Sequence, residues 1–190
     1  TSDKIRANQE ISDLILALGC GTGKDFKLDK LRYERVIIMT DADVDGAHIA
    51  ALLITLFYQE MHGLIQSGAL YLALPPLYRL SAGGESVYAR DDAHKDELMK
   101  TVFKGRKKVD ISRFKGLGEM PAAQLKETTM DMKKRGLIRV ALPESERSTD
   151  AFKKAEGGTA QLIERLMGKN PEARFEFIQE NAKFAQDIDI

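Results

Sequence analysis

Three aspartates at alternate positions have the clearest chemical potential in this chain. Asp41, Asp43 and Asp45 follow the short apolar run 36–39, and Gly46 comes directly after them. In an extended backbone, residues i, i+2 and i+4 point to one side, so the three carboxylates are expected to converge. Converging carboxylates repel one another unless a cation neutralises them, and oxygen ligands suit Mg²⁺ or Ca²⁺ rather than zinc. The pattern therefore predicts a magnesium site formed by these three side chains.

The elements expected around the aspartates add phosphate chemistry to this prediction. The run 36–39 is typical of a buried strand in a parallel sheet, and residues 47–66 are expected to form a helix. A loop between such a strand and such a helix faces the crevice where α/β proteins bind ligands, and the helix end favours phosphate oxygens. The structural alternative is that Asp45 caps the helix while the other acids are solvated.

Two other acidic motifs share part of this pattern. A calcium-binding EF-hand loop also begins Asp-x-Asp-x-Asp-Gly, but it needs Glu at its twelfth position, where Leu52 stands, and a helix before it. Phosphatases of the haloacid-dehalogenase class place Asp-x-Asp after the strand that opens the fold, with an acidic pair downstream. Asp91 and Asp92 could be that pair, although 35 residues precede the strand here. A calcium-binding module and a magnesium phosphatase are the alternatives to weigh.

Hydrophobic periodicity and turn residues predict an α/β fold. Strand, helix and strand within residues 36–74 form a βαβ unit, which implies a parallel sheet. Gly83-Gly84 between two short strands predicts a hairpin. Helices are expected over 8–18, 47–66, 91–102, 121–129, 144–167 and 171–184, and strands over 36–39, 69–74, 77–81, 86–89 and 137–142.

Composition limits the possible partners and the cellular location. The 29 basic residues balance the 29 acidic ones, so overall charge gives no support for nucleic-acid binding. Basic residues do concentrate at 104–108 and 113–115, and next to an acidic cluster such a stretch favours phosphate binding over a merely solvated face. No apolar run is long enough to span a bilayer, and the single Cys20 cannot form an internal disulfide. These features favour a cytoplasmic protein without membrane association.

Four segments, in order along the chain, resemble one protein family. Residues 37–49 resemble the second metal motif of the Toprim domain, and residues 75–79 (Pro-Pro-Leu-Tyr-Arg) resemble the segment that follows it. Residues 113–120 resemble a Lys-Gly-Leu-Gly-Glu-Met signature, which residues 124–130 continue. The chain is thus similar to the Toprim and tail regions of the B subunit of bacterial type IIA DNA topoisomerases. The form Arg113-Phe114-Lys115 and the short span from Tyr88 to Arg113 favour the topoisomerase IV branch, with the gyrase branch as a close alternative.

The resemblance implies a fold, a mechanism and partners. The fold would be a partial Toprim domain over residues 1–120, with a parallel sheet flanked by helices. A helical tail over 121–190 would pack on it and on a partner A subunit, in an A₂B₂ assembly. The A subunit would supply the tyrosine that cuts double-stranded DNA, while Mg²⁺ held by Asp41 and Asp43, with Asp45 supporting, stabilises the reacting phosphate.

The resemblance also implies DNA-contacting residues. Lys115 would lie near the DNA backbone, and Arg113, His48 and Arg79 are further candidates for DNA contact. No catalytic residue is expected in this chain acting alone, and the tyrosines are expected to be core residues.

Two departures from the family pattern lead to further expectations. The family's Glu-Gly-Asp-Ser motif, which carries another metal ligand, and its ATP-binding and transducer domains are not among these 190 residues. We therefore expect the chain alone to bind Mg²⁺ weakly, to lack ATPase activity and to cut nothing. ATP would serve the full-length subunit only.

Overall fold

The computed structural model describes residues 7–41, 43–146 and 158–182, and the chain divides into two compact units, Thr1–Val140 and Ala141–Ile190. The elements of the first unit, in chain order, are α2 (Gln9–Leu18), β1 (Val36–Ile38), α3 (Val44–Glu60), α4 (His62–Gln66), β2 (Leu70–Leu74), β3 (Tyr78–Ala82), β4 (Glu85–Ala89), α5 (Asp92–Lys100), β5 (Asp110–Arg113), α6 (Ala122–Leu125), a π-helical turn (Lys126–Met130) and β6 (Gly136–Arg139). Short 3-10 turns cover Gly23–Asp25, Leu28–Lys30 and Leu117–Glu119.

The predicted βαβ unit is confirmed. β1 pairs in parallel with β2 in the register Val36 to Leu70, and α3 and α4 connect the two strands. β6 pairs antiparallel with the other edge of β2, giving the strand order β1-β2-β6, so the sheet is mixed rather than wholly parallel. Some apolar residues on the strands and helices of this part form its buried core, among them Leu18, Ile38, Phe57, Leu64 and Leu70.

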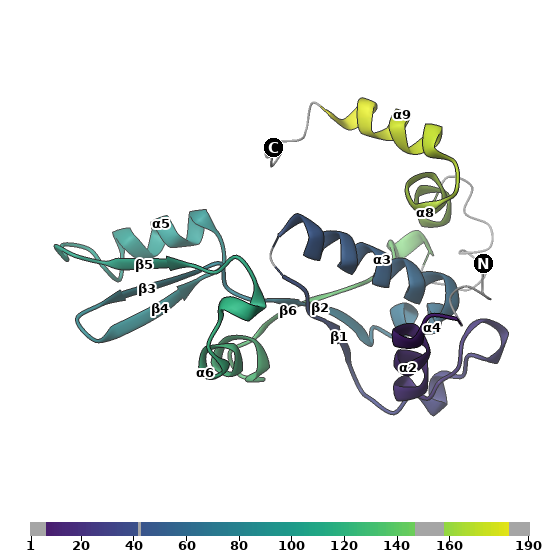
Figure 1. Cartoon of the computed structure of the whole chain (residues 1–190), viewed down its shortest axis with the longest axis horizontal. Helices are drawn as coiled ribbons and strands as arrows, with labels where there is room; N and C mark the ends of the chain where they lie inside the picture. Colours follow the sequence, from purple (N-terminus) through teal and green to yellow (C-terminus); the bar gives the residue numbers. More distant parts are fainter. Residues whose placement is uncertain (1–6, 42, 147–157, 183–190) are drawn as a thin grey trace. The chain divides into compact units, whose positions relative to one another are not determined.

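The predicted hairpin of β3 and β4 is also confirmed and belongs to a second, antiparallel sheet with the order β4-β3-β5. Apolar side chains from this sheet and from α5 and its carboxyl-terminal extension form their own core, comprising Tyr78, Leu80, Ala82, Ala89, Leu98 and Phe103. In Figure 1, β3, β4, β5 and α5 form one group, while β1, β2, β6 and helices α2 to α4 form another. The segment after β2, which contains Pro75-Pro76, joins the two groups.

Several boundaries differ from the sequence prediction. The helix expected over 47–66 starts earlier and is interrupted at Met61, whose backbone has φ −140° and ψ 47°. The helix expected over 121–129 changes from α to π geometry at Lys126. β5 was not predicted, because only one of its four residues is apolar and all four are exposed.

The second unit contains a 3-10 turn (Glu144–Glu146), α8 (Thr159–Met167) and α9 (Pro171–Asn181). Residues 147–157, the middle of the helix expected over 144–167, lie outside the described residues. The Arg165 guanidinium joins α8 to α9, since it pairs with Glu180 at 2.8 Å and lies 5.4 Å from the Phe177 ring centre. In the described part of the chain, no helix is long and apolar enough to cross a membrane.

Candidate metal and nucleic-acid site

Asp41 lies in the loop between β1 and α3, where it meets a segment far away in the sequence. Its Oδ1 accepts a hydrogen bond of 2.7 Å from the backbone N–H of Leu117, 76 residues later in the chain. The acidic loop and the Lys115–Glu119 segment, which carry two of the motifs singled out in the sequence, therefore form one site.

Two glycines allow this close approach. A Cβ added at Gly116 would lie 3.1 Å from Asp41 Cγ, and one added at Gly46 would lie 2.1 Å from the Asp41 carbonyl oxygen. The second distance involves backbone atoms of Asp41, so no side-chain movement could relieve the overlap. The glycines at 46 and 116 are consequently part of what positions Asp41.

The three aspartates do not form one extended row. Asp43 is the N-cap of α3, with its Oδ1 accepting from the Gly46 N–H at 2.7 Å, and Asp45 lies in the first turn of the helix. The capping role considered for Asp45 therefore belongs to Asp43. Among the described residues, no group of three or more His, Cys, Asp or Glu side chains is arranged to hold a metal ion.

The chemistry of the donors nevertheless fits magnesium. Mg²⁺ keeps several waters and is commonly held by one or two carboxylates together with substrate phosphates. Asp41 and Asp43 are exposed oxygen donors next to a helix amino terminus, and each uses Oδ1 for one backbone N–H. Among the described contacts no hydrogen bond reaches the Oδ2 atom of either residue, so each carboxylate keeps an oxygen for a cation.

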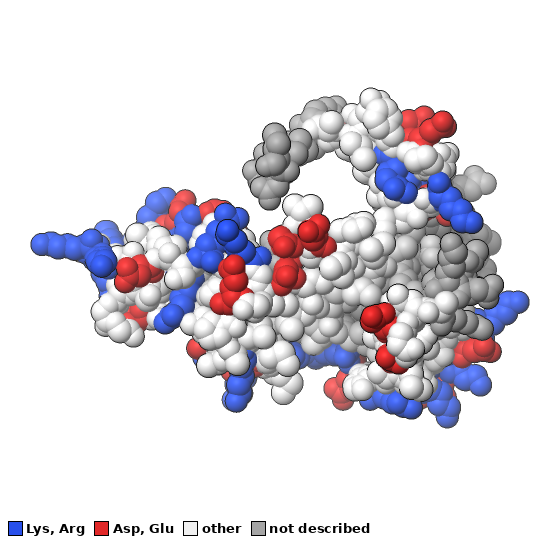
Figure 2. Space-filling model, viewed as in Figure 1, with Lys and Arg blue, Asp and Glu red and all other residues white. Residues whose placement is uncertain are grey.

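The Lys115–Glu119 segment follows β5 as a compact turn. The Lys115 backbone N–H donates to Glu119 Oε2 at 2.9 Å, and Leu117–Glu119 forms one turn of 3-10 helix. The Lys115 side chain is exposed. Figure 2 shows acidic side chains gathered over the start of α3, with basic side chains beside them. A surface with both signs of charge could hold a cation and a phosphate together.

The other predicted DNA-contacting residues lie on different elements. His48 is exposed in α3, close to its amino terminus. Arg113 ends β5, with its guanidinium 6.0 Å from the Tyr78 ring centre. Arg79 lies inside β3 and donates to Ser86 Oγ at 3.0 Å, which holds it against β4. A role in DNA contact stays a prediction for all three.

The alternative acidic motifs find little support in the geometry. A strand rather than a helix precedes the acidic loop, unlike an EF-hand. The pair Asp91 and Asp92 has local structural roles, since Asp91 caps α5 and Asp92 accepts a hydrogen bond of 2.9 Å from the Tyr78 hydroxyl.

The basic stretch 104–108 is partly structural. The Arg106 guanidinium donates to the Ala82 carbonyl at 2.7 Å and pairs with Glu85, so it fastens the segment after α5 to the β3–β4 hairpin. Sequence reasoning also missed the roles of Leu117, Gly116 and Glu119 in holding Asp41 and its neighbouring turn. Gly116 and Gly118 of the Lys-Gly-Leu-Gly-Glu-Met signature were the available signal, although they do not reveal that Asp41 is the partner.

Comparison with known proteins agrees with the fold and with the family resemblance of the motifs. The Toprim domain family matches residues 2–73, and the family described as DNA gyrase B subunit, carboxyl terminus, matches residues 106–179. The chain is 62% identical over its whole length to the B subunit of DNA topoisomerase 4 from Caulobacter vibrioides, and 59% identical over 99% of its length to the Bartonella bacilliformis protein of the same name. It is 47% identical over 99% of its length to the B subunit of DNA gyrase from Thermotoga maritima.

The strand, acidic loop and helix thus define a Toprim domain, followed by a region of the gyrase B carboxyl-terminal type. The chain belongs to the family of type IIA DNA topoisomerase B subunits, which confirms the resemblance seen in its motifs. It spans 26% of the length of the Caulobacter vibrioides and Bartonella bacilliformis proteins and 28% of the length of the Thermotoga maritima protein.

Proposed function

We propose that this chain supplies the magnesium-binding and DNA-contacting region of a type IIA topoisomerase B subunit. The observation that carries the proposal is the hydrogen bond from the Leu117 N–H to Asp41, because it joins the acidic loop to the Lys115–Glu119 turn. A carboxylate for a cation and a lysine for a DNA phosphate then lie in one site, as DNA cleavage requires.

In this proposal Asp41 and Asp43 bind Mg²⁺, and Asp45 supports them through its negative charge. Magnesium bound there would neutralise charge developing at the reacting phosphate. Lys115 contacts the DNA backbone, with Arg113, His48 and Arg79 as further candidates for DNA contact. The tyrosine that attacks the DNA comes from the partner A subunit rather than from this chain.

The whole subunit would act on double-stranded DNA with the A subunit as an A₂B₂ assembly, using ATP bound by its other domains. The topoisomerase 4 names of several relatives favour a topoisomerase IV type of subunit, for which we expect decatenation and relaxation, while a gyrase-type B subunit is the second candidate. A tail from about residue 121 that packs on the Toprim domain and the A subunit, and a cytoplasmic location, stay predictions.

The proposal can be tested in a full-length B subunit that carries this sequence, combined with its A subunit. Asp41→Asn keeps an acceptor for the Leu117 N–H but removes the charge that attracts Mg²⁺. We expect Mg²⁺-dependent DNA cleavage to fall by about 100-fold or more, with DNA binding largely retained. Asp29→Asn, an exposed acid in the 3-10 turn Leu28–Lys30, is the matched control. Unchanged cleavage by Asp41→Asn would remove the proposed metal site.

A second test addresses the chain by itself. With supercoiled DNA and Mg²⁺ but no A subunit, it should relax nothing. Relaxation by the purified chain would contradict the proposed division of labour between the subunits.

A further inference from the structure

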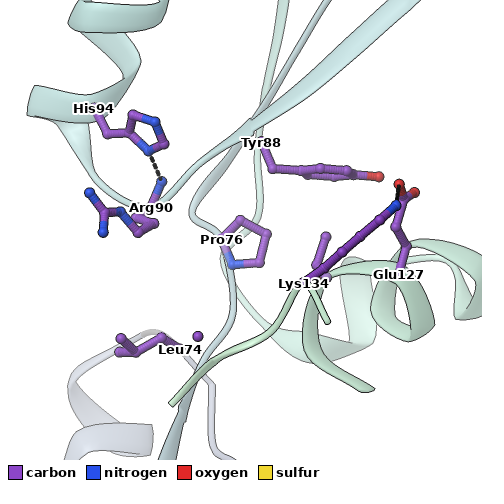
Figure 3. Close-up of a pocket in the computed structure, with 9 residues that line it drawn as sticks. Leu74, Pro76, Tyr88, Arg90, His94, Glu127 and Lys134 are labelled. Carbon is purple, nitrogen blue, oxygen red and sulfur yellow. Dashed lines mark hydrogen bonds and ion pairs between the residues drawn. The ribbon is translucent and has the colours of Figure 1, made fainter. Parts of the chain in front are cut away.

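A cavity of about 420 Å³ lies apart from the Asp41 site and has no role in the proposed function (Figure 3). Its lining comes from three parts of the first unit. Leu74 and Gly136 belong to the β1-β2-β6 sheet, Tyr88 and His94 to β4 and α5, and Glu127 to the π-helical turn. The size is within the range of about 300–1,000 Å³ that suits small-molecule ligands.

One part of the lining is apolar and flat. Pro76 and Leu74 contribute aliphatic surface, and Figure 3 shows the Tyr88 ring above and to one side of Pro76. A ring face near a proline offers apolar packing surface to a planar aromatic group. The shape therefore favours a flat ligand.

The polar part of the lining is rich in hydrogen-bond donors. Burial, followed by the charge of Glu127, raises the pKa of Tyr88, so its hydroxyl stays protonated and can donate. His94 Nδ1 accepts from the Arg90 backbone N–H at 3.3 Å, which leaves the proton on Nε2 as another donor. Lys134 Nζ lies 2.9 Å from Glu127 Oε1, at the end of the cavity toward which the Tyr88 hydroxyl points (Figure 3).

Charge around the cavity is positive on balance. Arg90 and Lys134 line it, and the charge of Arg79 acts on the lining residue Tyr88. The opposing carboxylates are those of Glu127 and, next to Lys134, Asp131. Arg79 pairs with Tyr88 across the β3–β4 register, and its Nε is buried without a hydrogen-bond partner among the described residues. An excess of cations and donors favours an anionic ligand.

We propose that this cavity binds small planar aromatic carboxylates. The ring packs against Tyr88 and Pro76, and the carboxylate accepts hydrogen bonds from the Tyr88 hydroxyl and Lys134. Such a ligand touches both sheets of the first unit and so fixes the β3–β4–β5 sheet relative to the β1–β2–β6 sheet. Because Asp41 follows β1 and the Lys115–Glu119 turn follows β5, the ligand would also steady the contact between them.

The test is calorimetric titration of the chain with naphthalene-2-carboxylate, using naphthalene-2-carboxamide as the neutral analogue. Lys134→Gln should weaken carboxylate binding about tenfold, since it removes a charged donor. Glu127→Gln should strengthen it about tenfold, because Lys134 is released from its ion pair and a repulsive charge is removed. Lys133→Gln, exposed and outside the lining, is the control and should leave the affinity unchanged.

The opposite signs of the two effects separate binding from a general loss of structure, which would weaken binding in both variants. Lys134 and Glu127 are both well exposed, with side-chain exposures of 57% and 48%, so neither substitution removes core packing. No binding at about 1 mM probe, equal affinity for the carboxamide, or equal carboxylate affinity in the two cavity variants would each overturn the proposal.

Discussion

The Asp41 carboxylate depends on residues that have no functional group. Gly46 lies in the first turns of α3, directly against the Asp41 backbone, and Gly116 lies against its side chain. In both cases the absence of a Cβ makes room for the acid. The Asp-Gly pair at 45–46 is therefore explained by packing, and the metal-binding hypothesis is not needed to account for its glycine.

Gly46→Ala is expected to lower the free energy of unfolding by about 1–3 kcal/mol. The new methyl group would meet the Asp41 carbonyl oxygen and could be accommodated only by moving the loop or the helix. Urea denaturation followed by circular dichroism measures the change. Gly118→Ala is the matched control, because nothing lies within 4 Å of a Cβ at that position. Equal stability of the two variants would show that the loop yields easily.

Arg106 and Lys104 belong to the same basic stretch but should differ on substitution. Arg106→Ala removes the hydrogen bond to the Ala82 carbonyl and the pairing with Glu85, so we expect a loss of about 1 kcal/mol in unfolding free energy. Lys104→Ala, on an exposed side chain, should change stability very little. Thermal unfolding of both variants measures the difference, and an unaltered Arg106→Ala protein would contradict the structural role.

Among the elements, α5 is held to its sheet partly by charge. The Asp92 carboxylate in its first turn accepts from the Tyr78 hydroxyl of β3 and pairs with Lys95, whose ammonium lies 4.7 Å from the Tyr78 ring centre. The hydrogen bonds from Lys95 and Tyr78 lower the pKa of Asp92. A helix at the surface is thus joined to the hairpin by one ionised side chain.

Stability should therefore depend on pH through Asp92. A carboxyl whose pKa is lowered by folding stabilises the folded state at pH values above its pKa in the unfolded chain, about 3.9. This stability is lost as pH falls through the lower pKa that the carboxyl has in the folded protein. Asp92→Asn should reduce the acid sensitivity below about pH 4, while the exposed Asp29→Asn should retain it. Denaturant titrations at a series of pH values give the slope of the unfolding free energy against pH for each protein. Identical slopes for wild type and Asp92→Asn would count against this contribution.

Elements with strong local patterns were predictable from the sequence. The apolar run before the aspartates and the one at 69–74 matched β1 and β2, and Gly83-Gly84 matched the turn between β3 and β4. β5 was missed because it is an exposed edge strand, held by its pairing with β3 rather than by buried side chains. The π-helical turn at Lys126 has no clear local signature either.

The sequence indicated candidate residues for a cation site, which stay predictions, but it did not indicate their geometry. Alternating aspartates indicated a cation site, yet helix α3 begins at Val44 and takes Asp45 out of the extended run. The Leu117 contact joins residues 76 positions apart, so no local pattern could reveal it. The cavity at Tyr88 likewise depends on how three separate segments assemble.

For the molecule as a whole, the balanced charge makes any DNA contact local. With 29 basic and 29 acidic residues, long-range attraction to DNA should be weak, and binding should depend on a few phosphate contacts. Because log affinity falls by about 0.9 per log unit of salt for each phosphate contact, affinity for duplex DNA is expected to fall only moderately as salt is added.

Lys115→Gln should lower that affinity and reduce the slope of log affinity against log salt by about 1. Its backbone hydrogen bond to Glu119 does not involve the side chain, so the turn should survive the substitution. Fluorescence anisotropy with labelled duplex DNA at several salt concentrations measures the slope, and Lys30→Gln is the exposed control. An unchanged slope for Lys115→Gln would exclude a phosphate contact at this lysine.

The bond between Leu117 and Asp41 also has a thermodynamic consequence. The Asp41 carboxylate can make two interactions at once, since Oδ1 accepts the hydrogen bond that orders the turn while Oδ2 stays open to a cation. If Asp41 binds the ion more tightly when the turn is ordered, anything that immobilises the turn, such as a nucleic-acid strand lying across it, raises that affinity, and by linkage the ion favours the ordered turn by the same factor. Cooperativity between the two ligands would then arise from a single side chain, without any movement of the domain.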